Sequence, residues 1–191
     1  MKKDIYYNEF YGKLYEKTEK GTLEKFEINS KHGKIEHLFI KRLIPSEDEE
    51  KFYDIVTPYG YGGPLILECL NKEELLEQFE EEFSEYCKKN NIVSEFIRFH
   101  PIFANALDFN KMYDVIYSRH TVGTNLKDYE DPVKSEFSKS LRREIRKAEE
   151  KGITVKTILD PQDLSIFKKL YEETMKRNNA DSYYYFPDSY Y

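Results

Sequence analysis

The run Thr57-Pro-Tyr-Gly-Tyr-Gly-Gly-Pro64 is the local feature of this sequence best suited to binding a ligand. Its three glycines permit positive φ and a close approach of the backbone to a ligand, and its two prolines stiffen the ends. Tyr59 and Tyr61 offer ring faces and hydroxyl groups beside Gly62 and Gly63, which suits a sugar or a nucleotide. A rigid turn between two strands is the structural alternative. The run lacks the lysine and the Ser or Thr of a phosphate-binding P-loop, so it is not an ATP site.

Cationic side chains gather on a helix predicted over residues 133–151. Arg142 and Arg146 are four residues apart, which places them on neighbouring turns, and Lys147 extends the group. Because guanidinium groups bind phosphate through paired hydrogen bonds, the cluster is a candidate contact for a pyrophosphate or an RNA backbone. The alternative is a solvated helix face on which the cations pair with neighbouring Glu residues.

Arg98 lies in a predicted strand among aromatic neighbours. Strand alternation places Phe96 and Arg98 on one face and Ile97 and Phe99 on the other. A charge in such surroundings must be paired or face a cleft, so Arg98 is a candidate binding residue. His100, before a proline, is either a general base or a structural histidine bonded to the backbone, and the second role is the more common one.

Motifs that would identify a catalytic residue do not occur in the sequence. Gly-x-Ser-x-Gly, His-Glu-x-x-His and Cys-x-x-Cys are all missing, and the carboxylates are too evenly spread to single out an acid/base pair. Two cysteines, Cys69 and Cys87, supply neither a disulfide framework nor a zinc site alone. The catalytic residue is therefore unknown, no metal site is predicted, and a reducing cytoplasm is the expected setting.

Composition narrows the class of protein. The 191 residues carry 36 acidic against 30 basic side chains, and a net charge of −6 weighs against bulk binding of nucleic acid or anionic membranes. The 17 Tyr and 13 Phe provide core area that a disordered chain lacks. No apolar run is long enough to span a membrane, and the N-terminus does not resemble a signal peptide.

The elements that must position these residues alternate between helix and strand. Asn71 followed by Glu74 is typical of a capped helix start, and an apolar face then continues as far as Asn90. The remaining predicted elements are helices over 4–20, 133–151 and from 161 onward, with strands over 23–28, 34–44, 52–56, 65–67, 92–99, 113–117, 121–126 and 153–159. The pattern predicts an α/β fold (α+β, mixed sheet) with antiparallel pairs near the N-terminus.

A change of pattern near residue 128 predicts two domains. Residues 1–128 supply a complete small domain, whereas 129–191 supply only helix, strand, helix and a tail rich in tyrosine. That is too little to bury both faces of a sheet, so we expect 129–191 to be the incomplete beginning of a second domain. An incomplete domain with such an end would favour self-association.

Five segments, in this order, resemble the Fem family of peptidoglycan-bridge aminoacyl transferases and its relatives in the GNAT acyltransferase superfamily. The segments cover nearly the whole chain: Phe39-Ile-Lys-Arg42, Asp54-Ile-Val-Thr-Pro-Tyr-Gly-Tyr-Gly-Gly-Pro64, Ser94-Glu-Phe-Ile-Arg-Phe-His-Pro101, Arg142-Arg-Glu-Ile-Arg-Lys-Ala148 and Leu170-Tyr-Glu-Glu-Thr-Met-Lys-Arg-Asn178.

The resemblance implies two GNAT-like domains in tandem, a GNAT-like acceptor-side domain and the start of a second. Members transfer an amino acid from charged tRNA, or an acyl group from another activated donor, onto an amine of a cell-wall precursor, and hold no tightly bound cofactor. It implies that the UDP-sugar end of the acceptor lies on the first-domain side of a cleft. Lys13, Arg146 and Lys147 fall where the family has cations for the acceptor phosphates, with the Tyr-Gly loop near the same cleft.

Two departures from the family keep other functions open. The family's second domain, which holds much of the donor site, continues well past residue 191. The Arg/Gln-x-x-Gly-x-Gly/Ala loop that holds the pyrophosphate of coenzyme A in many GNAT enzymes is also missing, which argues against acetyl-CoA as the donor. One alternative is therefore a non-catalytic module that binds the acceptor without the donor domain. An RNA-binding protein that uses the basic helix and tyrosine stacking is the third hypothesis.

Overall fold

The computed structural model describes residues 3–47 and 49–191, and the chain divides into two units, Met1–Tyr117 and Ser118–Tyr191. This division falls ahead of the boundary predicted near residue 128. The assignment of residues 1–128 and 129–191 to two GNAT-like domains stays a prediction.

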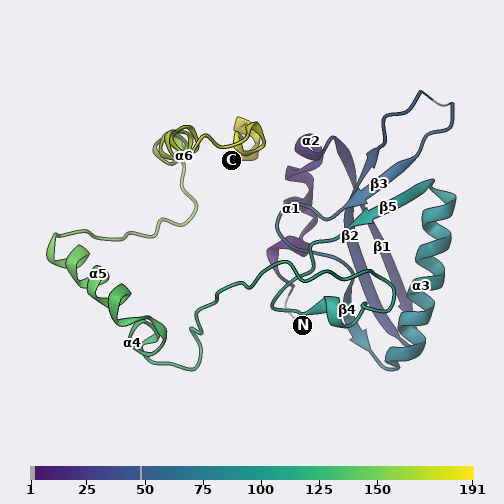
Figure 1. Cartoon of the computed structure of the whole chain (residues 1–191), viewed down its shortest axis with the longest axis horizontal. Helices are drawn as coiled ribbons and strands as arrows, with labels where there is room; N and C mark the ends of the chain where they lie inside the picture. The colour runs from purple at the N-terminus through teal and green to yellow at the C-terminus, as the bar shows by residue number, and fades with distance from the viewer. Residues whose placement is uncertain (1–2, 48) are drawn as a thin grey trace. The chain divides into compact units, whose positions relative to one another are not determined.

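Unit 1 is built on one mixed sheet (Figure 1). The strands follow the order β1-β2-β3-β5, and β4 also pairs with β2. The pairs that involve β2 are antiparallel, whereas β3 and β5 are parallel. The predicted α/β fold with a mixed sheet, and its antiparallel pairs near the N-terminus, are therefore confirmed. The strands are β1 (Gly21–Ser30), β2 (Gly33–Leu43), β3 (Tyr53–Val56), β4 (Leu65–Cys69) and β5 (Ile92–Phe96).

The hairpin between β1 and β2 is tighter than the sequence pattern predicts. The strands predicted over 23–28 and 34–44 leave a five-residue loop between them. This is wrong, because Ser30 pairs with Gly33 and the turn consists of Lys31 and His32 alone. Gly33 has φ +144°, a conformation that favours glycine, and this lets the ladder continue to the end of both strands. Polar residues near a turn can extend a ladder that an apolar pattern alone would end earlier.

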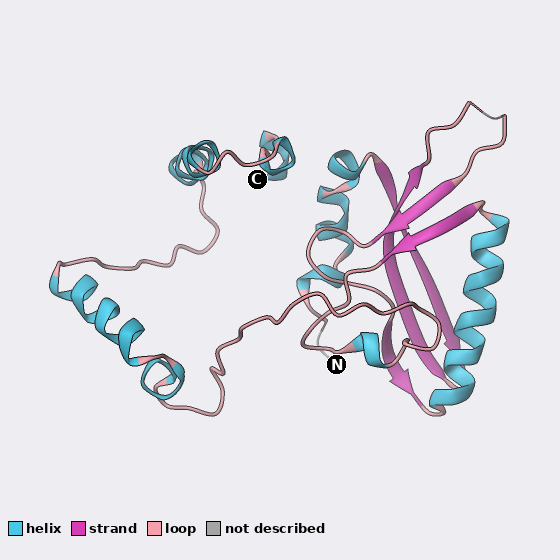
Figure 2. Ribbon diagram, viewed as in Figure 1, coloured by secondary structure: helices cyan, strands magenta, loops and turns pink. Residues whose placement is uncertain are grey.

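Helices cover both faces of the sheet (Figure 2). The helix α3 (Lys72–Lys89) packs on one face, where Leu75 and Phe79 meet Phe39 and Ile35 of β2 in the main core. The carboxamide oxygen of Asn71 accepts a hydrogen bond from the Glu74 N–H at 3.5 Å, as the capping pattern predicts. This helix is confirmed over nearly its whole predicted length.

The opposite face is covered by the N-terminal segment, which is not the single helix predicted over 4–20. It consists of a 3₁₀ turn η1 (Ile5–Tyr7), then α1 (Glu9–Leu14) and α2 (Glu16–Glu19). Asn8 has an extended backbone, and its side chain accepts a hydrogen bond from the Phe10 N–H at 2.8 Å, so it ends one element and caps the next. Competition by such side-chain bonds is the physical reason for the break.

Unit 2 contains short helices and a tail. These elements are α4 (Pro132–Glu136), α5 (Lys139–Glu150), α6 (Ser165–Arg177) and the 3₁₀ turns η3 (Ser182–Tyr184) and η4 (Asp188–Tyr190). The helix predicted over 133–151 is interrupted because Ser138 has a non-helical backbone and its hydroxyl caps α5 at the Leu141 N–H. Arg142 bridges the interruption by donating to the Lys134 carbonyl at 3.0 Å.

The strands predicted over 113–117, 121–126 and 153–159 are not present in the described part of the chain. A strand needs neighbouring backbone groups to pair with, and among the described residues no partner strand lies beside these segments. Their apolar pattern is real, but a pattern alone supplies no hydrogen bonds. Of the helices in residues 3–47 and 49–191, none combines the length and the apolar character needed to cross a membrane.

Candidate functional site

The parallel strands β3 and β5 end side by side, and the candidate site begins there. The Thr57 N–H donates to the Phe96 carbonyl at 3.2 Å, and the Arg98 N–H donates to the Thr57 hydroxyl oxygen at 3.2 Å. The carboxyl ends of neighbouring parallel strands are where open α/β sheets commonly bind ligands. The sequence-predicted loop 57–64 and Arg98 both leave the sheet at this edge.

The loop 57–64 turns back and lies along the segment that follows β5. The Gly62 N–H donates to the Arg98 carbonyl at 2.8 Å, and Gly62 forms a parallel bridge with Phe99. Gly62 and Gly63 are buried, whereas Tyr59 is exposed and Tyr61 is half-buried. The loop is thus a rigid turn whose tyrosines remain accessible. The structure is compatible both with a turn between strands and with a loop that offers its tyrosines to a ligand.

Tyrosines of the N-terminal segment pack against the loop. The Tyr6 ring meets Tyr61 edge-on with centroids 5.5 Å apart, and the Tyr11 hydroxyl donates to the Tyr59 carbonyl at 3.0 Å. Tyr15 stacks on Tyr59 at 5.8 Å. The exposed edge of the loop is therefore part of an aromatic surface.

The inner side of the loop rests on buried polar groups that spacing along the sequence did not indicate. The Tyr7 hydroxyl donates to the Gly62 carbonyl at 3.1 Å, and the Asn105 amide donates to the same carbonyl at 2.9 Å. Burial raises the pKa of Tyr7, and nearby Asp4 adds to the shift. Both side chains come from segments more than forty residues away from the loop, so no local signal in the sequence could find them.

Arg98 is exposed beside an aromatic ring. Its guanidinium carbon lies 5.3 Å from the centre of the Phe96 ring, and both side chains point away from the half-buried Ile97 and Phe99, as strand alternation predicts. Within residues 3–47 and 49–191, no carboxylate pairs with this guanidinium. An exposed guanidinium without a carboxylate partner among the described residues can bind an anion such as a phosphate.

His100 has the geometry of a structural histidine. Its ring is buried, and Nδ1 accepts from the backbone N–H groups of Ile102 and Phe103 at 3.2 and 3.3 Å. Nε2 lies 3.6 Å from the Asp4 carboxylate. Burial lowers the pKa of His100, although Asp4 acts in the opposite direction. With Nδ1 bonded to the backbone and Nε2 beside Asp4, the ring holds the turn in place and packs edge-on against Tyr61 of the loop.

Lys13 lies in α1, close to the loop in the fold but directed elsewhere. Tyr11 and Tyr15 contact Tyr59, and Lys13 is roughly 200° around the helix axis from Tyr11. The side chain of Lys13 is exposed. The structure therefore brings Tyr59, Tyr61, Gly62, Gly63 and Arg98 together, while Lys13 occupies the other side of α1.

The predicted cations of α5 belong to unit 2. Lys147 pairs with Glu144 at 2.9 Å, as expected for a solvated helix face, and Arg142 is engaged with a backbone carbonyl. Arg143 and Arg146 are exposed, and neither forms an ion pair with any described residue. Part of the cluster thus fits the solvated-face alternative, and two guanidinium groups remain available for an anion.

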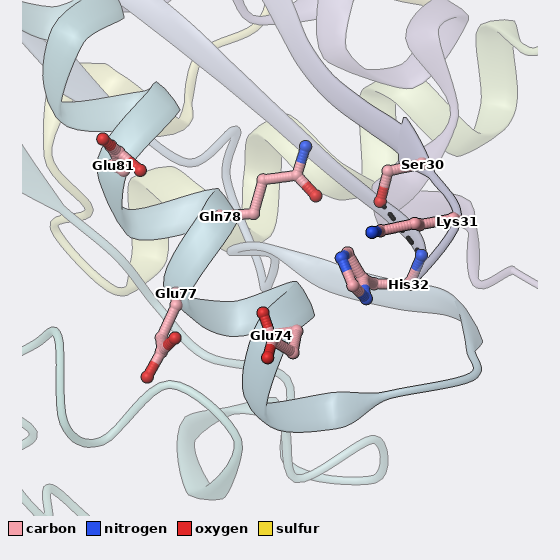
Figure 3. A pocket seen from close by; sticks show the side chains of 7 residues that line it. All are labelled: Ser30, Lys31, His32, Glu74, Glu77, Gln78 and Glu81. Carbon is pink, nitrogen blue, oxygen red and sulfur yellow. Dashed lines mark hydrogen bonds between the residues drawn. The ribbon is translucent and has the colours of Figure 1, made fainter.

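A separate hollow of about 310 Å³ lies between the β1–β2 turn and α3 (Figure 3). Three of its seven lining residues are acidic: Ser30, Lys31, His32, Glu74, Glu77, Gln78 and Glu81. It shares no residue with the loop 57–64. Over the part of the chain that the structure describes, no group of His, Cys, Asp and Glu side chains is arranged to hold a metal ion.

Comparison with known protein families bears on unit 2 and on the end of unit 1. Residues 108–190 match the model of the FemAB family. This part of the chain is therefore similar to the FemAB family. The Fem-like resemblance inferred from the sequence is confirmed there, and the basic helix α5 and the tyrosine-rich tail both lie inside the FemAB match. Comparisons with curated proteins and with solved structures gave no match.

Proposed function

We propose that this chain acts in Fem-type transfer of an aminoacyl or acyl group to an amine of a cell-wall precursor. The observation that carries the proposal is the match of residues 108–190 to the FemAB family. We place the acceptor side in unit 1, with Tyr59, Tyr61, Gly62, Gly63 and Arg98 at the carboxyl ends of β3 and β5. The expected setting is the cytoplasm.

The chemistry of the site suits the UDP-sugar end of a peptidoglycan precursor. The Arg98 guanidinium, without a carboxylate partner among the described residues, is complementary to a diphosphate. The tyrosine rings of the loop 57–64 can stack on a sugar or a base, since such stacking needs only an accessible ring face. Gly62 and Gly63 are buried, so they shape the loop that carries these rings.

The reaction would form a C–N bond and break a C–O bond. The acceptor amine attacks the ester carbonyl of an aminoacyl-tRNA, the terminal hydroxyl of the tRNA leaves, and the proton lost by the amine balances the one that the hydroxyl gains. Holding amine and ester together supplies most of the acceleration in such a transfer, and hydrogen-bond donors near the developing oxyanion supply more. No residue of this chain is assigned as the proton carrier.

The donor is proposed to be charged tRNA. Arg143 and Arg146 on α5 provide unpaired positive charge suited to an RNA backbone or to acceptor phosphates. An acyl-CoA donor is less well supported because the sequence lacks the Arg/Gln-x-x-Gly-x-Gly/Ala loop.

Binding of a UDP-sugar-peptide, measured by isothermal titration calorimetry, tests the acceptor site. Arg98→Gln should weaken binding about 10- to 100-fold, because a charge-assisted hydrogen bond to phosphate is worth about 1.5–3 kcal/mol. Lys88→Gln, which removes an exposed cation at the end of α3, is the charge-matched control and should bind like the parent.

The positions suggested by the family resemblance need their own variant. Lys13→Ala combined with Arg146→Ala should weaken the same binding if these cations contact the acceptor phosphates. Unchanged affinity in this double variant would remove both residues from the site. Unchanged affinity in Arg98→Gln would remove the acceptor site from the β3–β5 edge.

A further inference from the structure

Asn105 is a buried side chain that connects two loops of unit 1. It begins the 3₁₀ turn η2 (Asn105–Leu107) and is 1% exposed. Its carboxamide oxygen accepts from the His100 N–H at 2.8 Å. Its amide nitrogen donates to the carbonyls of Gly62 and Pro64 at 2.9 and 3.0 Å. Both N–H groups and the oxygen of the amide are thus used.

The backbone next to Asn105 is held in an uncommon conformation. Ala104 has φ +51°, in the left-handed region that residues with a Cβ rarely adopt. The Ala104 N–H donates to the His100 carbonyl at 2.9 Å, which fixes the turn. Such conformations persist where the surrounding structure requires them, and they concentrate at functional sites. Here the outcome is that the Asn105 amide points into the interior beneath the loop 57–64.

The loop has little regular pairing of its own. Apart from the bridge between Gly62 and Phe99, its inner carbonyls are held by side chains: the Asn105 amide bonds Gly62 and Pro64, and the Tyr7 hydroxyl also bonds Gly62. With these carbonyls turned inward, the three residues from Tyr59 to Tyr61 form the outer turn.

We propose that Asn105 is a positioning residue for the acceptor site. Its amide fixes the inner half of the loop 57–64, so that Tyr59 and Tyr61 are held in the binding conformation before the ligand arrives. Preorganisation of this kind raises affinity because less conformational freedom is lost on binding. The proposal rests on the proposed function, since it assigns Asn105 to the same acceptor site.

Asn105→Asp is the sharpest test because it keeps the shape and the acceptor oxygen but replaces the donor nitrogen. At neutral pH we expect the exchange of the Gly62 amide hydrogen, followed by NMR, to accelerate at least tenfold. Affinity for a UDP-sugar-peptide should fall about tenfold or more. Asn90→Asp is the matched control: its amide donates to the Tyr86 carbonyl at the end of α3, and neither readout should change.

A pH series separates positioning from a general loss of packing. When the introduced carboxyl group is protonated it can donate one hydrogen bond again, so affinity and Gly62 protection should partly recover as the pH falls. Asn105→Ala cannot recover in this way. His100, Asp4, Tyr6, Tyr7 and Tyr61 are the titratable groups packed around this turn and occur in both variants, so their effects cancel in the comparison. If Asn105→Asp does not fold, Tyr7→Phe removes only the second donor to Gly62 and should accelerate exchange by a smaller factor.

Three results would overturn the proposal. Unchanged protection of the Gly62 amide would show that Asn105 does not hold the loop. Faster exchange with unchanged affinity would show that the held conformation does not matter for binding. Absence of UDP-sugar-peptide binding by the parent chain would contradict both the proposed function and this inference. Normal binding by the parent, with the same affinity in the Asn105 variants, would contradict the inference alone.

Discussion

Replacing Gly60 by alanine should destabilise unit 1 by about 2–5 kcal/mol. Gly60 has φ +102°, and a Cβ built on it would lie 2.2 Å from Cε1 of Tyr6. The backbone conformation costs about 1–2 kcal/mol for a residue with a Cβ. The Tyr6 ring would also have to move, and each of its edge contacts with Tyr11 and Tyr61 is worth about 0.5–1.5 kcal/mol.

Urea unfolding followed by circular dichroism measures this change. Gly12→Ala is the control within the same unit, because there the added Cβ meets only the tip of the flexible Leu23 side chain. Alanine also gains about 1 kcal/mol in helix propensity at that position, so the net change should stay within about 1 kcal/mol. In a Tyr6→Ala background, Gly60→Ala should cost about 1–3 kcal/mol less, because the clashing ring is gone.

Two outcomes would refute this account of the loop. Equal costs for Gly60→Ala and Gly12→Ala would mean that neither the backbone conformation nor the Tyr6 ring constrains Gly60. Additive effects of Tyr6→Ala and Gly60→Ala would mean that the ring does not restrict that position, and the aromatic packing of the N-terminal segment on the loop would be in doubt.

Two further predictions concern titratable groups. Burial, aided by the Glu95 carboxylate, raises the pKa of the Cys87 thiol to about 11. Iodoacetamide at pH 8 should therefore label the exposed Cys69 much faster than Cys87, which peptide mass spectrometry can follow. Equal labelling rates would contradict the packing of α3. Burial lowers the pKa of His100 from its ordinary 6.5, so the folded state takes up a proton less readily than the unfolded one. Its contribution is neutral above pH 6.5 and becomes destabilising as the pH falls through 6.5 toward the lowered pKa. The free energy of unfolding should therefore drop less between pH 7 and pH 5 in His100→Gln than in the parent, and an identical drop would contradict the burial of this ring.

Local signals predicted α3 well. The Asn71 cap is a bond between residues three apart, and the apolar face repeats at helical spacing, so the sequence contains all that the helix needs. The interruptions at Asn8 and Ser138 are also local, since each side chain caps the helix that follows. They were missed because the apolar spacing continues across them.

Strand pairing was harder to predict from the sequence than the helices were. The segments over 113–117 and 121–126 have the apolar pattern of strands, but a strand exists only where another backbone pairs with it. The β1–β2 turn shows the opposite error, because pairing continues through polar residues as far as Ser30 and Gly33. In both cases the deciding hydrogen bonds join different segments of the chain.

The candidate site likewise contains residues that the sequence could indicate and residues that it could not. Composition alone identified the loop 57–64 and Arg98, because glycine and tyrosine in that density are uncommon and a charge among aromatic residues requires a partner or an open surface. Asn105 and Tyr7 hold the loop through bonds across 43 and 55 residues of sequence. Spacing cannot predict contacts of that kind.

Transfer onto the acceptor is the most direct test of the central claim. The chain would be incubated with a UDP-sugar-peptide and a mixture of charged tRNAs, and the mass of the peptide product measured. The account predicts a gain of one aminoacyl residue on the acceptor amine, lost when the tRNA is uncharged. An unchanged mass with every charged tRNA and acyl-CoA supplied, while the acceptor still binds, would contradict a transferase and favour a module that only binds the precursor.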